Sequence, residues 1–312
     1  NNISVISADD EYAGVCGFTH EDLQKIINVQ SGPNASGGDI AENLAYQLAK
    51  NLGANYAVIP ITQSYEHTVE QLSTTTITNL GTHKEFTLEL STLVKENIQA
   101  RDRGARIIAA ASAAFGGAFS CNSNKAETSV GYATFYGDIA GAVAMIGDLW
   151  KHQVYALGLY LNEQIFHREV IPNDIFNIRP SAELSDAQTV GKGGDPLIYP
   201  YHDYLLRAFI ENWHKTTPAD VLRWYKAGTL AEELGCSSTI IKQSFPDAAS
   251  FIADLERWWR LFAGFSVAKR IQAPPIMSIT KRSFGYDHRE AQLAPYFSRE
   301  FYQLKEELLA QK

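Results

Sequence analysis

Apolar positions along the chain alternate between long stretches at helical spacing and short continuous runs. Over residues 39–52 they recur every three or four positions, and Gly53 follows as a stop signal, so the pattern predicts a helix. The run YAVIPI at 56–61 is short, apolar and partly β-branched, which is typical of a buried parallel strand. A short helical run precedes both at 23–28, and the polar stretch 62–86 predicts loop with a short helix.

The rest of the chain continues this alternation. A long helical pattern covers 87–115, and the strand-like run AFSC follows at 118–121. Helical spacing returns over 150–165, and the Gly- and Pro-rich stretch 190–200 lies between helical patterns, which favours an ordered active-site loop over a linker. Helices that alternate with short apolar strands indicate βαβ units and a parallel sheet. We therefore predict an α/β fold, with residues 1–312 in one domain.

The composition is that of an ordinary globular protein and favours a small-molecule ligand. The chain has 312 residues and a mass of 34.6 kDa, with 45% hydrophobic and 20% charged residues. Its net charge of -8 argues against a general nucleic-acid binder, although it leaves room for a local basic pocket that binds phosphates.

Cysteine usage and hydropathy favour a cytoplasmic protein. Cys16, Cys121 and Cys236 are odd in number and far apart, which predicts neither a disulfide framework nor a metal knuckle and fits a reducing compartment. No apolar run reaches the roughly 18 residues of a membrane span, and no charged-then-apolar leader opens the sequence, so we expect no membrane association. The eight histidines lack the close pairing of a zinc site.

Two segments carry a concentration of polar groups. Asn97 and Arg101 stand four residues apart on one face of a predicted helix. In isolation, such a charge-rich helical segment is more often a solvent-exposed face. The segment 122–141 follows a predicted strand, at the edge where open α/β sheets bind ligands. Within it, Glu127 is suited to hold a hard cation, and Asp138 is suited to accept a hydrogen bond from a hydroxyl or an amide.

Three further segments contain groups that can contact phosphates, and each is weak evidence alone. Lys151 opens a predicted helix and can contact a phosphate there, although a lysine in this position is more often simply exposed. The segment IRPSAEL contains Ser181, and the segment AKRIQAPP contains Lys269.

The order and spacing of five motifs resemble the synthetase domain of NAD synthetases, particularly the glutamine-dependent bacterial kind. The motifs are NIQARDRG, SNKAETSVGYATFYGDIAG, a lysine ten residues after the last glycine, RPSAEL and KRIQAPP, within a match over roughly residues 29–290. The resemblance implies an adenine-nucleotide-hydrolase-like fold: a Rossmann-like parallel sheet with helices on both faces, in a homodimer. It also implies a ligase that uses ATP and Mg²⁺ to adenylate deamido-NAD, releases pyrophosphate, and lets ammonia displace AMP to give NAD.

The resemblance also assigns roles to individual residues. These are a Mg²⁺ ligand, Glu127; ATP contacts, Asn122, Lys151 and Ser181; and deamido-NAD contacts, Arg101, Asp138 and Lys269. Lys151 and Asp138 are expected to take part in catalysis. Asn122 stands where the family has a threonine, which weakens that ATP contact, whereas Ser181 keeps the hydroxyl of the family's threonine or serine.

The stretch QSGPNASGGDIAE at 30–42 looks like the family's Ser-Gly-Gly-x-Asp-Ser pyrophosphate loop, but its context differs. The preceding KIINVQ is too short and polar for a buried central strand, and Pro33 lies where that strand would pair. With the helix to Leu52 and the run YAVIPI, the stretch instead resembles the family's second strand–loop–helix unit. We therefore expect the first unit, with its loop, to be absent from this sequence, and we expect the full polypeptide to carry it before Ser31. A truncated chain, a degenerate, non-catalytic chain and a register-shifted pyrophosphate loop at 30–42 are the alternatives.

Two other functions stay open. One is another ATP pyrophosphatase that amidates a different carboxylate, such as a GMP-synthetase-like protein, and the other is a non-catalytic dinucleotide-binding paralogue. Deamido-NAD-dependent release of pyrophosphate from ATP separates all three. The nitrogen source is open as well: no glutaminase domain is evident in the 312 residues, so this chain alone should use ammonia, with delivery from a glutaminase domain as the alternative.

Overall fold

The structure is a computed structural model that describes residues 27–30, 40–178, 180, 195–284 and 295–310. The chain divides into two compact units, each built from several segments. The first unit comprises Asn1–Asn122, Thr134–Ala142 and Leu157–Asp195, and the second comprises Ser123–Ala133, Val143–Ala156 and Pro196–Lys312. That residues 1–312 act as a single domain stays a prediction.

The first unit begins with a parallel βαβ arrangement: β1 (Ile27–Gln30), α3 (Ile40–Leu52) and β2 (Asn55–Val58). The two strands pair in parallel, with Ile27 opposite Asn55 and Gln30 opposite Val58. This confirms the predicted helix and the parallel strand that follows it. The strand is only partly buried, however, because α3 packs against the pair and leaves both ends of β2 exposed. The helical run predicted at 23–28 is wrong for its last two residues, since pairing with β2 makes them extended.

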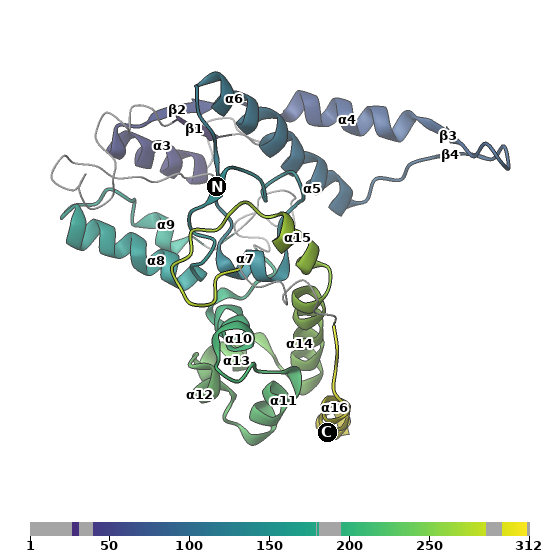
Figure 1. Cartoon of the computed structure of the whole chain (residues 1–312), viewed down its shortest axis with the longest axis vertical. Helices are drawn as coiled ribbons and strands as arrows, with labels where there is room; N and C mark the ends of the chain where they lie inside the picture. The colour runs from purple at the N-terminus through teal and green to yellow at the C-terminus, as the bar shows by residue number, and fades with distance from the viewer. Residues whose placement is uncertain (1–26, 31–39, 179, 181–194, 285–294, 311–312) are drawn as a thin grey trace. The chain divides into compact units, whose positions relative to one another are not determined.

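A helix and a hairpin follow where loop and a short helix were predicted. They are α4 (Thr62–Thr74), β3 (Thr76–Thr78) and β4 (Glu85–Thr87), with the hairpin at the far end of α4 in Figure 1. The polar residues are compatible with helix because their hydroxyls bond back to carbonyls one turn earlier, as Thr68 does to Ser64 at 2.8 Å. The hairpin turn is held by Asn79, whose side-chain oxygen accepts from the amides of Gly81 and Thr82.

The helical pattern predicted over 87–115 is confirmed from residue 92 onward. Three helices follow one another there: α5 (Thr92–Arg101), the π-helix η1 (Asp102–Ile108) and α6 (Ala109–Ala114). Ser91 begins the series by accepting a hydrogen bond from the Val94 amide at 3.4 Å. The first unit also contains β5 (Ser120–Cys121), η2 (Leu161–Ile165) and α9 (Asp174–Asn177), and its core includes Leu48, Leu52, Val170 and Ile171.

The second unit is mainly helical. Its elements are α7 (Lys125–Val130), β6 (Val143–Ala144), the first part of α8 (Lys151–Tyr160), α10 (Tyr199–Glu211), α11 (Pro218–Ala227), α12 (Leu230–Leu234), α13 (Ser238–Ser244), α14 (Ala248–Ala263), α15 (Ser266–Gln272) and α16 (Arg299–Ala310). The helix predicted at 150–165 is confirmed by α8 and η2. Of the predicted loop at 190–200, residues 190–194 lie outside the described residues and the last two residues start α10. Aromatic residues fill the core, and the rings of Tyr225 and Phe251 stack at 4.1 Å.

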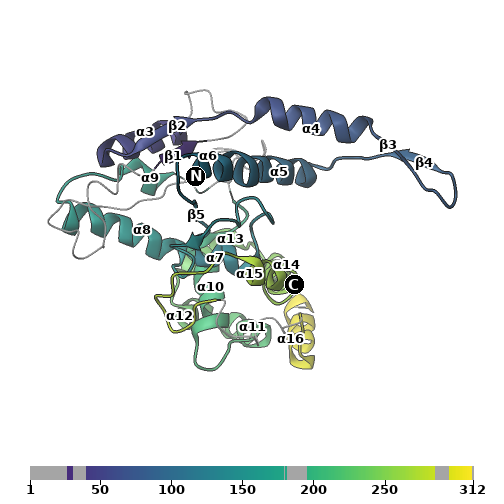
Figure 2. The same ribbon diagram turned by 45° about the horizontal axis from the view of Figure 1, so that its top comes forward.

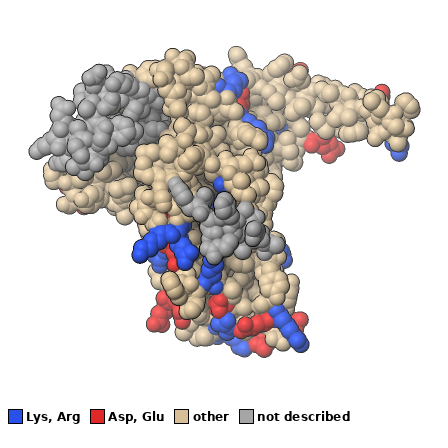
Figure 3. Space-filling model, viewed as in Figure 1, with Lys and Arg blue, Asp and Glu red and all other residues tan. Residues whose placement is uncertain are grey.

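The last helix, α16, packs beside α11 and α14 (Figures 1 and 2). Its buried face consists of Phe301, Leu304 and Leu308. Mixed charges lie over α11 and α16, as Figure 3 shows. Arg223 and Glu300 form an exposed ion pair at 2.6 Å. Exposed ion pairs contribute little to stability, so burial of the apolar face is what holds α16 against α11 and α14. Within the described residues, no helix combines the length and apolar character that a bilayer crossing requires.

Candidate active site

Helix α7 fixes the carboxylate of Glu127 through a reciprocal cap. Asn124, the residue before the helix, accepts hydrogen bonds from the amides of Ala126 and Glu127 at 2.9 and 3.1 Å. Glu127 in return accepts from the Asn124 amide at 2.9 Å and from its side-chain nitrogen at 2.7 Å. Gly131, with φ 64°, ends the helix in the left-handed conformation that glycine adopts without strain. The Asn-Lys-Ala-Glu sequence therefore sets both the start of the helix and the direction of the carboxylate.

Lys151, at the start of α8, lies next to this carboxylate. Its Nζ is 3.9 Å from Glu127 Oε1, to which the Tyr199 hydroxyl also donates at 3.0 Å. The ammonium group lies over the Tyr199 and Tyr155 rings, 5.3 and 5.7 Å from their centroids. Both charged side chains stay partly exposed, at 23% for Lys151 and 17% for Glu127. The sequence predicted a metal ligand and a phosphate contact at these positions, and the structure brings the two side chains together.

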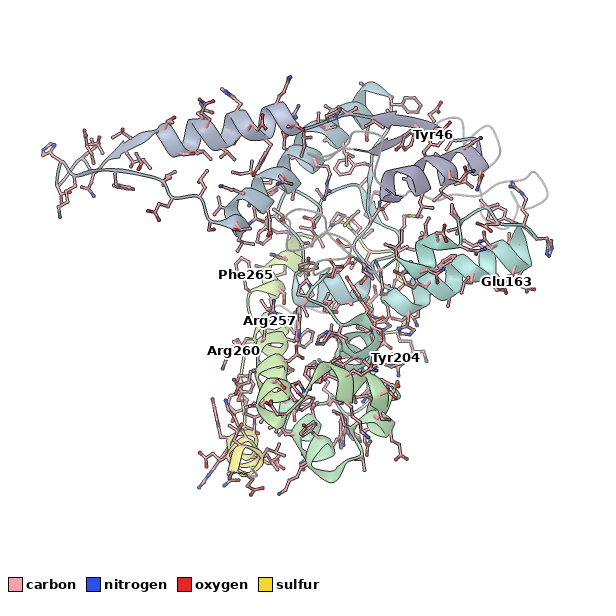
Figure 4. The ribbon with its side chains drawn as sticks, turned by 180° about the vertical axis from the view of Figure 1, so that it is seen from behind. Tyr46, Glu163, Tyr204, Arg257, Arg260 and Phe265 are labelled. Atoms are coloured by element: carbon pink, nitrogen blue, oxygen red, sulfur yellow. The ribbon has the colours of Figure 1, made fainter. Side chains whose placement is uncertain are left out.

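Lys269 is the third predicted site residue in the second unit. Its Nζ donates to the Gly131 carbonyl at 2.6 Å and to the Ala133 carbonyl. The ammonium also lies 5.6 Å from the ring centroid of Phe265, which is labelled in Figure 4. Lys269 is thus tied to the loop that follows α7, and its contact with deamido-NAD stays a prediction.

In the first unit, the loop 134–138 gathers the other predicted residues. Thr134 donates through its hydroxyl to Asn97 at 2.7 Å and through its amide to Asp138 at 2.6 Å. Arg101, exposed at the end of α5, donates to the Phe135 carbonyl at 3.1 Å. The structure therefore brings Asn97, Arg101 and Asp138 to one loop, which their separation in sequence did not establish.

For two other predicted site residues, Asn122 and Ser181, the structure gives little or no information about ligand binding. Asn122 accepts a hydrogen bond from the Ser120 hydroxyl at 2.9 Å, which orients its side chain without showing a ligand contact. Ser181 lies outside the described residues, as do 1–26 and 31–39, where the pyrophosphate-loop question falls. The roles of these residues, and the unit expected before Ser31, stay predictions.

Sequence reasoning missed several residues that form the surroundings of the site. Lys125 is completely buried and pairs with Asp148 and Glu211, each at 2.8 Å. His152 and Asp203 form a second pair at 2.8 Å. No signal in the sequence connects Lys125 to Glu211, because 86 residues separate them.

Glu127 can bind a divalent cation only if water and substrate supply most of the other ligands. In the described part of the chain, no group of three or more His, Cys, Asp or Glu side chains is arranged to hold a metal by itself. Magnesium, however, usually takes one or two carboxylates and completes its shell with water and substrate phosphates. Glu127 meets that requirement for one protein ligand, and the nearby Lys151 can offset phosphate charge.

The described residues form a mixed α/β protein with a parallel βαβ unit and a Glu127–Lys151 ion pair at 3.9 Å. The chain belongs to the NAD synthase family, whose model matches residues 26–242. This confirms the resemblance and the predicted fold class. A crystal structure of a glutamine-dependent NAD(+) synthetase from Cytophaga hutchinsonii shares the fold, with a TM-score of 0.58 and 20% identity over 90% of this chain and 40% of that one.

Curated relatives extend the comparison. The chain is 32% identical to the glutamine-dependent NAD(+) synthetase of Aquifex aeolicus over 78% of its own length. It is 38% identical to that of Thermotoga maritima over 54% of its own length. The chain spans only 36% and 27% of these two relatives, respectively.

Proposed function

We propose that the chain catalyses the ATP-dependent amidation of deamido-NAD to NAD, as a carbon–nitrogen ligase. In the first step a carboxylate oxygen of the nicotinate attacks the α-phosphorus of ATP, and pyrophosphate leaves. In the second step ammonia attacks the acyl carbon, AMP leaves with the electrons of the broken acyl–oxygen bond, and the new amide nitrogen releases a proton to solvent. The observation that carries this proposal is the Glu127–Lys151 pair, which provides a carboxylate and an ammonium 3.9 Å apart within the family match.

Two residues of the second unit, Glu127 and Lys151, take the main part of the phosphate side of the reaction. Lys151 holds the triphosphate and offsets the negative charge that develops as pyrophosphate departs. Glu127 would hold Mg²⁺, which when bound supplies Lewis-acid stabilisation to the phosphate oxygens. The reciprocal cap with Asn124 keeps the Glu127 carboxylate in one orientation before any ligand arrives. Asn122 and Ser181 are the further ATP contacts that we propose.

Arg101, Asp138 and Lys269 are the residues that we propose to contact the dinucleotide. Asp138 is held by the Thr134 amide, so the direction of its carboxylate is set before a hydroxyl or amide of deamido-NAD arrives to donate. Arg101 is exposed and its Nε is fixed on the Phe135 carbonyl, which leaves the guanidinium aligned for the anionic groups of a dinucleotide. Lys269 carries a positive charge that can also bind the anionic groups of the dinucleotide.

A product assay tests the proposal. With ATP, Mg²⁺, deamido-NAD and ammonium, we expect equal amounts of NAD, AMP and pyrophosphate. Formation of ADP and phosphate would exclude adenylation. Pyrophosphate release that ignores deamido-NAD but follows another carboxylate would favour a different ATP pyrophosphatase, and no turnover with tight dinucleotide binding would favour a non-catalytic binder.

Nitrogen source and assembly belong to the same proposal. We propose that this chain uses ammonia as its nitrogen source and that a glutaminase domain delivers it. The proposal is supported by the curated relatives, which are named glutamine-dependent NAD(+) synthetases. We propose a cytoplasmic homodimer, since the odd number and wide spacing of the cysteines suit a reducing compartment. Comparing turnover with glutamine and with ammonium separates the nitrogen sources, and sedimentation equilibrium determines the oligomeric state.

A further inference from the structure

The first turn of α8 is anchored to α10 by one buried carboxylate. Asp203, on α10, is 0% exposed, and its Oδ2 accepts two hydrogen bonds from a single residue of α8. One comes from the backbone amide of His152 at 2.9 Å and the other from its ring nitrogen Nδ1 at 2.8 Å. An ionised carboxylate can only accept, so Nδ1 is the donor in this contact when Asp203 is charged.

These bonds complete the cap of α8 from outside the helix. The first amides of a helix lack partners within it. In α8, Gln153 accepts from the Trp150 amide at 3.0 Å, and Asp203 accepts from the His152 amide. A negative charge at this end also interacts favourably with the helix dipole. Since the acceptor belongs to α10, the cap fixes where the first turn of α8 lies relative to α10.

The same face of α10 holds Lys151. Tyr199 and Asp203 are four residues apart on α10 and therefore neighbours on its surface. The ring of Tyr199 lies below the Lys151 ammonium and its hydroxyl donates to Glu127, whereas Asp203 holds the next residue of α8, His152. One face of α10 thus contacts two consecutive residues in the first turn of α8: Lys151, the proposed phosphate contact, and His152.

The surroundings of Asp203 favour this role over ordinary packing. Its second oxygen, Oδ1, is buried without a hydrogen-bond partner among the described residues, so the two bonds from His152 are the ones that hold this carboxylate. Burial raises the pKa of Asp203 above its ordinary value, while the hydrogen bonds and charge of His152 and the charge of Lys151 act in the opposite direction. The His152 ring is further held by stacking on Tyr204, 5.0 Å away and labelled in Figure 4.

We propose that Asp203 is a positioning residue, which holds Lys151 in place for ATP by anchoring the adjoining His152. The inference rests on the proposed function, because that function makes ATP the substrate. The anchoring itself rests on the contacts between α8 and α10. Asp203 does not touch the nucleotide in this scheme. Its effect on the reaction passes through Lys151.

A double-mutant cycle on the full chain tests this route. Asp203→Leu removes both acceptors, and we expect kcat/KM for ATP to fall on the order of 10- to 100-fold while KM for deamido-NAD stays unchanged. Asp203→Asn keeps one acceptor for the His152 amide and should recover part of the loss. In a Lys151→Ala background, Asp203→Leu should add little further loss, because both changes act on the same contact. Losses that multiply, or equal changes in both KM values, would overturn the proposal.

A matched control and a measurement without turnover complete the test. Asp247 also caps a helix, α14, so Asp247→Asn should leave KM for ATP unchanged. Hydrogen exchange of the His152 amide should become faster in Asp203→Leu than in the unaltered chain, with α14 amides unaffected. Unchanged exchange at His152 overturns the anchor even if the chain makes NAD. A chain that makes no NAD but shows the faster exchange refutes the proposed function and leaves the anchor standing.

Discussion

Lys125 and Asp148 form an ion pair that is completely closed to solvent, with Nζ 2.8 Å from Oδ1. Asp148 also accepts from the amides of Ile279 and Thr280, and Lys125 also donates to Glu211. The pair therefore connects α7, the segment before α8, the end of α10 and the segment after α15. Because α7 carries Glu127 and α8 begins with Lys151, this buried network supports both residues of the proposed phosphate site.

Removal of the buried ammonium should destabilise the protein strongly. Lys125→Met would leave the Asp148 carboxylate buried without its cation, and such changes typically cost about 3–5 kcal/mol. Urea unfolding, followed by circular dichroism, measures the free energy of unfolding. Lys226→Ala serves as the control: it breaks an exposed pair with Glu307 and should cost less than about 1 kcal/mol. Equal losses in the two variants would contradict this account.

Acid should weaken the same network in a defined direction. Burial alone would raise the pKa of Asp148, but hydrogen bonds from Lys125, Thr280 and Ile279 lower it below the ordinary value of 3.8. A carboxyl whose folded-state pKa is depressed stabilises the fold above its unfolded-state pKa and loses that stabilisation as pH falls below it. The free energy of unfolding should therefore decline as pH falls through 3.8, and the decline should be smaller in Asp148→Asn. A decline of the same steepness in both proteins would contradict the assignment to Asp148.

The phosphate site should respond to charge removal without loss of fold. Lys151→Ala deletes the proposed ATP contact, and Glu127→Ala deletes the proposed Mg²⁺ ligand. Each should slow adenylation about a hundredfold, corresponding to roughly 3 kcal/mol of lost transition-state stabilisation. Pyrophosphate release measures the step, and circular dichroism checks the fold. Since Glu127 also caps α7, Glu127→Gln is the better-matched variant, because it keeps an acceptor for the Asn124 amide. Normal turnover in these variants would remove both roles.

Local patterns in the sequence predicted the elements more successfully than the contacts. The helical spacing that predicts 39–52 is sufficient to identify α3, and the order of the motifs is sufficient to identify the family. The strand at Ile27–Gln30 depends on pairing with β2, which a helical period in KIIN conceals. The anchor between His152 and Asp203 joins residues 51 apart, and neither residue type at its position signals the other. Long-range pairing of this kind is a property of the folded chain and not of any window in it.

Two glycines set the position of the loop that carries Asp138. Gly104 lies in the π-helix η1, and a Cβ on it would lie 2.2 Å from the Gly137 carbonyl oxygen. Gly137 approaches the same helical segment from the loop, where its own Cβ would lie 2.9 Å from the Ala100 carbonyl carbon. The side-chain-free contact lets the loop backbone pack directly on the helix, and π-helical turns are frequent at functional sites.

Gly104→Ala should therefore move the loop and weaken dinucleotide binding specifically. A backbone atom 2.2 Å from the new methyl group must shift, and Asp138 follows Gly137 directly. A misplacement of the order of 1 Å in a positioning group can cost up to about a hundredfold, so we expect KM for deamido-NAD to rise on the order of tenfold or more. KM for ATP should change less, because the proposed phosphate residues Glu127 and Lys151 are held by contacts within the second unit. Gly117→Ala is the matched control, since its nearest neighbour would be the Ser112 carbonyl oxygen at an ordinary 4.0 Å. If Gly104→Ala binds deamido-NAD as tightly as Gly117→Ala does, the loop does not determine dinucleotide affinity, and the role proposed for Asp138 fails with it.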